Sequence, residues 1–170
     1  MNKGFLIYRI IVSLFITILP SCENQKKDPE FVGTWQFTEK ITSNELVYNN
    51  TRTIILTRNS YEETYLIQRE NSGIISAIVG TKGDLSQAHS TLTFSLKELG
   101  KCALDESDAC TDDVQWFGQG TDYFNDNIKY FETEVAGEFE VNGKTLRLVR
   151  DLNNDGDLED TGEDVTFTMI

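Results

Sequence analysis

Apolar and polar residues alternate along several segments of this chain, and this alternation restricts the folds open to it. Between positions 91 and 97, apolar Leu92, Phe94 and Leu96 are separated by polar residues. Segments 134–141 and 164–169 repeat this spacing. A period of two places one face of a strand against a core and the other in water, as in antiparallel sheets. We therefore expect an all-β protein.

Turn-forming residues divide the chain into short strands. Asn142-Gly143 is a favoured hairpin pair and lies between two alternating runs. Single turns of helix are expected at 86–89 and 103–108. Evenly spaced strands predict an antiparallel up-and-down β-barrel of about eight or nine strands, with a β-sandwich as the alternative. The predicted strands are 31–38, 51–58, 61–69, 74–81, 90–98, 113–118, 127–136, 138–150 (split at Asn142-Gly143) and 164–169.

The N-terminal segment has the pattern of an export signal. Lys3 and Arg9 precede the apolar run 10–19, and a small residue, Ser21, follows it. This run is shorter than the roughly 20 apolar residues that a membrane-spanning helix needs. Leu19-Pro20-Ser21-Cys22 resembles the lipobox of bacterial lipoproteins. The resemblance implies cleavage before Cys22 and acylation of Cys22, whereas an ordinary secreted protein with a free Cys22 is the alternative.

These features predict three parts of the chain. Residues 1–21 form a lipoprotein signal peptide, 22–30 a lipidated flexible tether, and 31–170 a single domain. We expect the protein to be held at the cell envelope, at the outer membrane, through lipid on Cys22. The sequence is compatible with either face of the outer membrane, the periplasmic one or the cell surface. Because exported proteins meet oxidising conditions, Cys102 and Cys110 are predicted to form a disulfide, with free thiols as the alternative.

The first predicted strand carries a family resemblance. Gly33-Thr34-Trp35 places Gly-x-Trp at its start, and Thr121-Asp122-Tyr123 lies further along the chain. These motifs are similar to those of lipocalins and lipocalin-like bacterial lipoproteins. The resemblance implies an eight-stranded barrel over 31–170 whose closed end is plugged by Trp35. It also implies a basic residue packed on that ring, a part that Arg147 or Arg150 would take.

An acidic segment near the C-terminus has the spacing of a calcium loop. Oxygen-bearing side chains lie at alternate positions from 151 to 155, followed by Gly156. The twelfth position is Gly162 rather than glutamate, so the segment is not a complete EF-hand loop. We expect a structural calcium ion here, with a solvated Asp-Gly turn as the alternative. The predicted ligands are Asp151, Asn153, Asp155, the carbonyl of Asp157, and Glu159.

Charge and motif content exclude several function classes. The formal net charge of −13 disfavours binding to nucleic acid, which needs clustered cationic side chains. The single histidine, His89, argues against most zinc hydrolase sites, and none of the common catalytic motifs occurs. We therefore expect a protein that is not an enzyme.

Two functions remain once nucleic-acid binding and catalysis are set aside. A lipocalin-like barrel would bind a small or partly apolar ligand inside. A structural or protein-interaction module of the outer membrane, stabilised by calcium and with an unknown partner, is the alternative. The inward-facing residues predicted to line the barrel are Ile54, Leu56, Leu92, Phe94, Leu96, Phe139 and Leu148.

Overall fold

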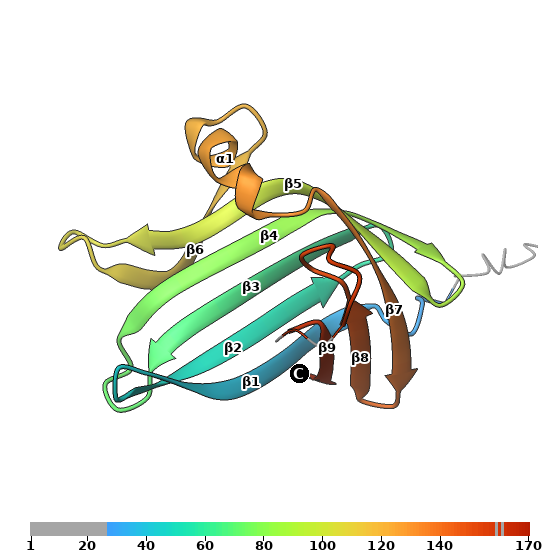
Figure 1. Ribbon diagram of the computed structural model, residues 1–170, viewed down its shortest axis with the longest axis horizontal. Helices are drawn as coiled ribbons and strands as arrows, with labels where there is room; N and C mark the ends of the chain where they lie inside the picture. The colour runs from blue at the N-terminus through green and yellow to red at the C-terminus, as the bar shows by residue number, and fades with distance from the viewer. Residues whose placement is uncertain (1–26, 159, 161) are drawn as a thin grey trace, which may run out of the picture.

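The computed structural model describes residues 27–158, 160 and 162–170, which form a β-barrel with one short helical segment (Figure 1). The helical segment consists of α1 (Asp122–Asn127) and the 3-10 turn η1 (Ile128–Tyr130). The strands are β1 (Gly33–Ser43), β2 (Leu46–Leu56), β3 (Ser60–Arg69), β4 (Ile75–Ala88), β5 (Thr91–Leu104), β6 (Cys110–Gly118), β7 (Glu134–Asn142), β8 (Thr145–Arg150) and β9 (Asp164–Met169).

Eight of these strands close into an antiparallel ring. Strands β1 to β5 follow one another in order, β5 then pairs with β7, and β9 returns to β1. Strand β6 stands outside the ring and pairs with the second half of β5. The predicted up-and-down barrel is therefore confirmed, and the alternative of a β-sandwich is wrong because the sheet closes on itself.

The barrel has two unlike ends because its strands differ in length. Strands β4 and β5 have 14 residues each, whereas β8 and β9 have 6. Strand β1 pairs with β9 only at Trp35 and Gln36. We call the part completed by β7–β9 the closed end, and the part where β1–β6 extend beyond them the open end (Figure 1).

Apolar side chains fill the closed end. Trp35 is fully buried, and its Nε1 donates a hydrogen bond to the Phe31 carbonyl at 2.8 Å. Phe31 meets Phe139 edge to face at 5.4 Å between ring centroids. The buried cluster consists of Phe31, Trp35, Ile54, Leu56, Tyr61, Leu85, Leu92, Phe94, Leu146, Leu148, Val165 and Phe167.

The predicted strand over 127–136 is wrong. This region forms α1 and η1, and β7 begins at Glu134. Thr121 caps the helix, because its Oγ1 accepts a hydrogen bond from the Phe124 amide at 3.3 Å. Phe124, Ile128 and Phe131 follow at helical spacing and pack on Leu96 and Leu99 of β5. Their spacing of four and three residues was the sequence signal for a helix.

Three hairpin tips also differ from the predictions. Strands β1 and β2 extend to a turn at Asn44-Glu45, where φ is 49° and 66°, as a type I′ turn requires. The helical turn expected at 86–89 is wrong, because β4 continues to Ala88. The turn expected at 103–108 is likewise a strand end followed by a hairpin loop, since β5 reaches Leu104.

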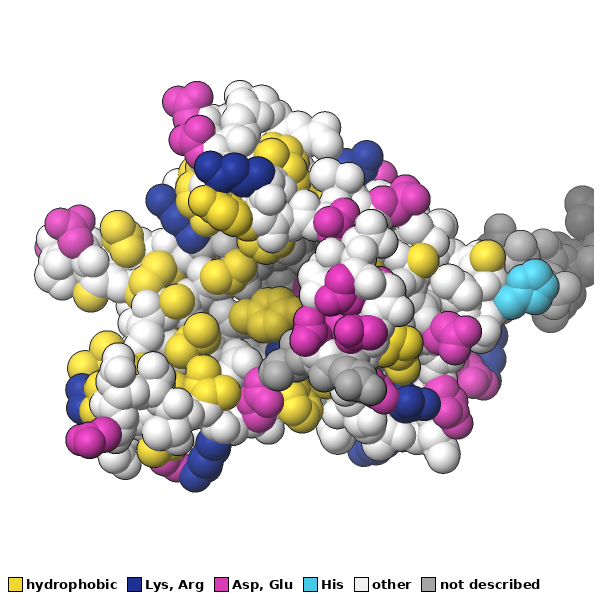
Figure 2. All heavy atoms as spheres, viewed as in Figure 1, with side chains coloured by type: hydrophobic (Ala, Val, Ile, Leu, Met, Phe, Trp, Pro, Cys, Tyr) yellow, Lys and Arg dark blue, Asp and Glu magenta, His cyan; other side chains and the backbone are white. Residues whose placement is uncertain are grey.

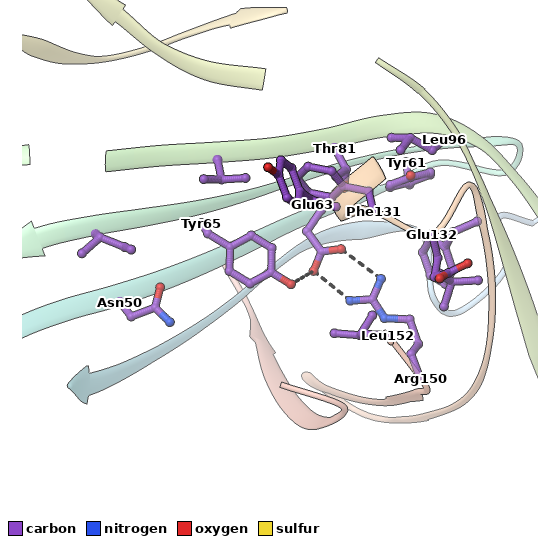
Figure 3. Close-up of a pocket in the computed structure, with 15 residues that line it drawn as sticks. Asn50, Tyr61, Glu63, Tyr65, Thr81, Leu96, Phe131, Glu132, Arg150 and Leu152 are labelled. Carbon is purple, nitrogen blue, oxygen red and sulfur yellow. Dashed lines mark hydrogen bonds and ion pairs between the residues drawn. The ribbon is translucent and has the colours of Figure 1, made fainter. Parts of the chain in front are cut away.

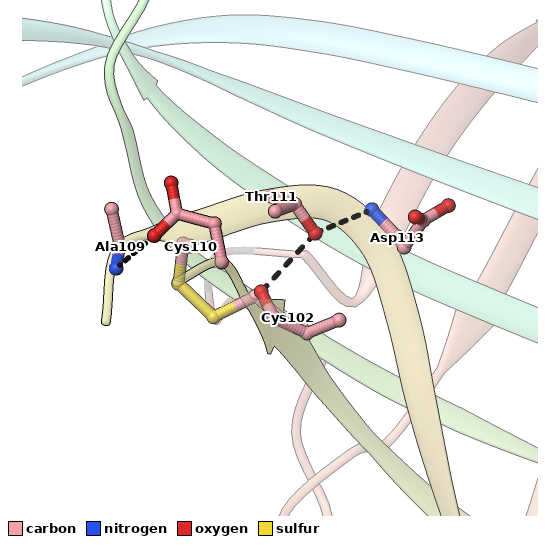
Figure 4. The surroundings of a disulfide bond; sticks show 7 residues. Cys102, Ala109, Cys110, Thr111 and Asp113 are labelled. Carbon is pink, nitrogen blue, oxygen red and sulfur yellow. Dashed lines mark hydrogen bonds between the residues drawn. A yellow bond between two sulfur atoms is a disulfide. The ribbon is translucent and has the colours of Figure 1, made fainter. Parts of the chain in front are cut away.

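The predicted disulfide is confirmed at the tip of the β5–β6 hairpin (Figure 4). Cys102 and Cys110 have Cα atoms 5.4 Å apart. In the loop between them, Asp105 Oδ1 accepts hydrogen bonds from the Ser107 hydroxyl and from the amides of Ser107 and Ala109. These bonds, with the Ser107 hydroxyl contributing most, hold the pKa of the Asp105 carboxyl below its usual value.

Candidate functional site

A cavity of about 430 Å³ lies inside the barrel at the open end. Its side walls come from β2, β3, β4, β5, β7 and β8, and the loop after β8 contributes Leu152. Figure 2 shows hydrophobic side chains gathered in a hollow at the centre of this face, below α1 and beside acidic side chains. The aliphatic lining consists of Ile67, Val79, Leu96, Val135 and Leu152, and the aromatic lining of Tyr61, Tyr65, Phe94, Tyr130 and Phe131.

Three charged side chains form a layer between this cavity and the closed end. Glu63 Oε1 and Oε2 accept hydrogen bonds from Arg150 Nη2 and Nη1, both at 2.9 Å (Figure 3). Arg52 Nε donates to the same Glu63 Oε1. All three side chains are at most 4% exposed. We call Arg52, Glu63 and Arg150 the charged layer.

The strand geometry explains why these charges point inward. On β3, Tyr61, Glu63, Tyr65 and Ile67 occupy alternate positions, and all four line the cavity. Arg150 lies opposite Gly137 of β7, and a Cβ at Gly137 would come within 2.3 Å of Arg150 Cγ. A side chain at position 137 would therefore displace the arginine from Glu63.

Aromatic rings cover the guanidinium groups of the charged layer. Arg52 Cζ lies 4.9 Å from the Tyr65 ring centroid, and Arg150 Cζ lies 4.8 Å from that of Phe94. Burial alone would lower the pKa of Arg52, but the Glu63 carboxylate and Tyr65 outweigh it and raise that pKa. Burial and, secondarily, the nearby Glu63 charge raise the pKa of Tyr65. Arg52 is thus held in the charged form.

The segment after α1 forms one rim of the cavity. Tyr130, Phe131 and Glu132 line it. Phe131 packs against the Leu96–Leu99–Phe124 cluster, whereas Tyr130 is 73% exposed. The rim is anchored from below because Phe124 is buried against β5. One side of the cavity mouth therefore carries an exposed aromatic ring next to an acidic side chain.

The residues of the predicted barrel-end motif occupy different parts of the molecule. Gly33 and Trp35 lie at the start of β1, and Trp35 is buried in the apolar cluster of the closed end. Arg147 is exposed and pairs with Asp164 through Nη2 at 2.6 Å. Arg150 is buried, but the ring beneath its guanidinium is Phe94. Thr121-Asp122-Tyr123, the second motif, begins α1.

The predicted lining of the barrel divides between the two ends. Phe94 and Leu96 line the cavity. The other members of the predicted set (Ile54, Leu56, Leu92, Phe139 and Leu148) belong to the apolar cluster of the closed end or pack against it. The predicted residues thus face the interior, but side chains fill the closed half of the barrel, so that Phe94 and Leu96 are the members of this set that line the cavity.

Sequence reasoning missed the charged layer. The sequence did contain a signal for it, because Arg52, Glu63 and Tyr65 occupy inward positions in alternating strands. A charge in the apolar phase of a strand indicates either a buried pair or a functional site.

The predicted calcium loop lies between β8 and β9. Asn153 Nδ2 donates to Asp155 Oδ2 and to Asp160 Oδ2, at 3.0 and 2.7 Å. Asp151 Oδ2 accepts from the Gly156 amide, while Asp151 Oδ1 is buried without a hydrogen-bond partner among the described residues.

The structure describes four of the predicted ligands of that loop, Asp151, Asn153, Asp155 and Asp157. Asp155 Oδ1 accepts a hydrogen bond from the Asp157 amide, and Glu159 lies outside the described residues. Within the part of the chain that the structure describes, no three acidic, histidine or cysteine side chains could hold a metal ion together. Calcium binding by this loop stays a prediction.

The loop also connects to the charged layer. Arg52 Nη1 donates to the Gly162 carbonyl at 2.7 Å, and the buried Glu163 accepts from the Leu152 amide at 2.8 Å. The loop is thereby fixed at both of its ends.

Neither a protein-family model nor a curated protein sequence matches this chain. Cys22, the predicted lipidation site, and the signal peptide lie outside the described residues. Among the residues that are described, no helix has the length and apolar character to cross a bilayer. The geometry of the barrel and its cavity is therefore the basis for any functional assignment.

Proposed function

We propose that this protein is a lipid-anchored, lipocalin-like binding protein that holds a small, partly apolar ligand in the cavity at the open end. The observation that supports this proposal is the cavity itself. Its volume of about 430 Å³ lies within the range of about 300–1,000 Å³ typical of small-molecule sites. A barrel whose closed end is solid and whose open end is hollow offers one defined site.

The lining supports a ligand with an apolar body and a polar end. Ile67, Val79 and Leu96 present apolar surface along the walls, while Glu63, Arg150 and Thr81 add polar atoms. A mostly apolar wall with a few fixed polar groups is typical of ligand pockets. Because the charged layer is hydrogen-bonded and buried, these polar groups are positioned before the ligand arrives.

A matched pair of substitutions tests the proposal. Ile67 and Leu66 are neighbours on β3, but Ile67 lines the cavity and Leu66 lies in the opposite phase of the strand. In Ile67→Trp the larger ring fills the cavity, whereas Leu66→Trp leaves the cavity unchanged. Binding of the uncharged fluorophore N-phenylnaphthylamine to the 23–170 domain is measured by its emission increase and by calorimetry.

We expect the fluorophore to bind the unmodified domain and the Leu66→Trp variant with similar affinity. In Ile67→Trp the affinity falls about tenfold or more, equivalent to about 1.4 kcal/mol. Equal loss in both variants, or no saturable binding to the unmodified domain, would contradict the proposal. Circular dichroism confirms that each variant is folded.

The alternative, a protein-interaction module, draws on the β5–β6 hairpin. Among the described strands, β6 pairs only with β5, so its other edge has unpaired backbone groups. Such an edge can accept a strand from another protein. Crosslinking at Gln115, an exposed residue of β6, in intact cells would favour this function if it captures a single partner while the cavity fails to bind the fluorophore.

A further inference from the structure

Resting on the proposed function, we infer that Glu63 acts as a built-in counter-anion, so that the cavity takes an uncharged, hydroxyl-bearing ligand in preference to a carboxylate of the same shape. Glu63 lines the cavity and is 3% exposed. It occupies the position that an anionic group of a ligand would otherwise take beside Arg150.

Both arginines already have a carboxylate or carbonyl partner. Arg150 uses Nη1 and Nη2 in a bidentate pair with Glu63. Arg52 uses Nε for Glu63 and Nη1 for the Gly162 carbonyl. A ligand carboxylate would have to displace Glu63, which would leave a buried carboxylate without its partners at a large free-energy cost.

Other acidic groups lie near the cavity and add to the repulsion of anions. Glu132 lines the mouth. Glu39 lies behind Asn50, whose Nδ2 donates to Glu39 Oε1 at 3.0 Å. The chain as a whole carries a net charge of −13. An anionic ligand would therefore approach against the field of the molecule and enter a site with like charges.

A cationic ligand is disfavoured by the same layer. The Glu63 carboxylate is already paired with both arginines. A ligand cation would have to displace an arginine from Glu63 and leave that buried guanidinium without its counter-charge. Because the charged layer disfavours anions and cations alike, an uncharged ligand is the favoured occupant.

Asn50 supplies a reason to expect a hydroxyl on that ligand. Asn50 lines the cavity, and because the Glu39 carboxylate can only accept, the Asn50 amide nitrogen must face Glu39. The Asn50 oxygen Oδ1 is left buried without a hydrogen-bond partner among the described residues. A small movement of the Asn50 side chain would expose this acceptor to the cavity, where a donor on the ligand, such as a hydroxyl, would satisfy it.

The test compares two probes of equal length, decanol and decanoate, on the 23–170 domain. Competition with N-phenylnaphthylamine at about pH 8, where decanoate is ionised, gives both affinities. We expect decanol to bind about tenfold or more tightly than decanoate. This ratio needs no variant, so it stands even if a substitution in the charged layer prevents folding.

Two variants then locate the selectivity. Glu63→Gln removes the counter-anion and leaves Arg52 and Arg150 to attract an anion, so the ratio should fall by about tenfold or reverse. Glu62→Gln removes the same charge from the neighbouring residue of β3, which lies in the opposite phase of the strand, and should leave the ratio unchanged.

Each outcome separates the inference from the proposed function. If decanoate binds the unmodified domain as tightly as decanol, the role given to Glu63 is wrong while the cavity remains a binding site. An equal change of the ratio in both variants would also overturn it. If neither probe displaces the fluorophore, and the fluorophore itself does not bind, the proposed function fails together with the inference.

Discussion

The closed end and the open end of this barrel share strands β1 to β5 but differ in what faces the interior. In the closed end, Trp35, Ile54 and Leu148 are almost completely buried in an apolar cluster. In the open end, β2 and β3 present Asn50, Tyr65 and Ile67 to a cavity. The comparison shows that side chains fill one end of the barrel, whereas the other end encloses a cavity.

The charged layer marks the border between the two ends. On β2, Arg52 is two residues from the closed-end Ile54, and on β3, Glu63 is two residues from Tyr61. A single step of the alternating pattern thus changes the interior from apolar to charged. Such a layer needs full hydrogen bonding to be tolerated, and Glu63 receives it from both arginines.

The largest expected effect contrasts two isoleucines. Ile54→Ala in the closed end removes a side chain that is 0% exposed, and should lower the free energy of unfolding by about 4 kcal/mol. Ile67→Ala in the open end enlarges an existing cavity next to solvent and should cost about 1 kcal/mol. Urea denaturation measures both, and similar losses would remove the distinction between the ends.

A smaller effect is expected from the charged layer. Glu63→Gln leaves two buried arginines without a counter-charge and should cost about 3 kcal/mol. Arg150→Met should cost less, because Arg52 and Glu63 remain as a balanced pair. If Arg150→Met proves the more damaging in the same denaturation experiment, Glu63 is not the shared partner of the two arginines.

The smallest effect concerns the exposed pair Arg147–Asp164, which lies on the outer surface of the closed end. The hydrogen bond from Arg147 lowers the pKa of Asp164, and both side chains are about half exposed. Asp164→Asn should therefore cost less than about 0.5 kcal/mol at neutral pH.

The pH dependence of that pair follows from the sign of the shift. Because the folded pKa lies below the unfolded value of about 3.9, the contribution is complete above that pH. It is lost as the pH falls from there through the folded pKa. Unfolding curves of the two proteins should converge on acidification, and a difference that grows instead would contradict this assignment.

Much of the fold could be predicted from sequence because alternation reports burial one strand at a time. The Asn142-Gly143 hairpin and the Cys102–Cys110 disulfide follow from local signals. Closure of the barrel does not follow from local signals, because β5 pairs with β7 rather than only with β6, and this pairing depends on long-range contacts. Period-two reading also assigned a strand to 127–136, where the helical spacing of Phe124 and Ile128 was the stronger signal.

The site was harder to predict than the fold. Alternation correctly placed Phe94 and Leu96 inward, but it could not show that the interior is solid around Leu148 and hollow around Ile67. That difference arises from the lengths of β8 and β9, which end before β2–β5 do. Arg147 or Arg150 was expected to pack on Trp35, whereas Arg150 pairs with Glu63 and Arg147 with Asp164.

Methyl NMR of the 23–170 domain, titrated with N-phenylnaphthylamine, tests the division of the barrel most directly. The account predicts saturable shifts for the methyl groups of Ile67, Val79 and Leu96, which line the cavity. The methyl groups of Ile54, Leu146 and Leu148 in the closed end should stay unchanged. Shifts centred on the closed end, or no shifts at saturating fluorophore, would contradict the assignment of the binding site to the open end.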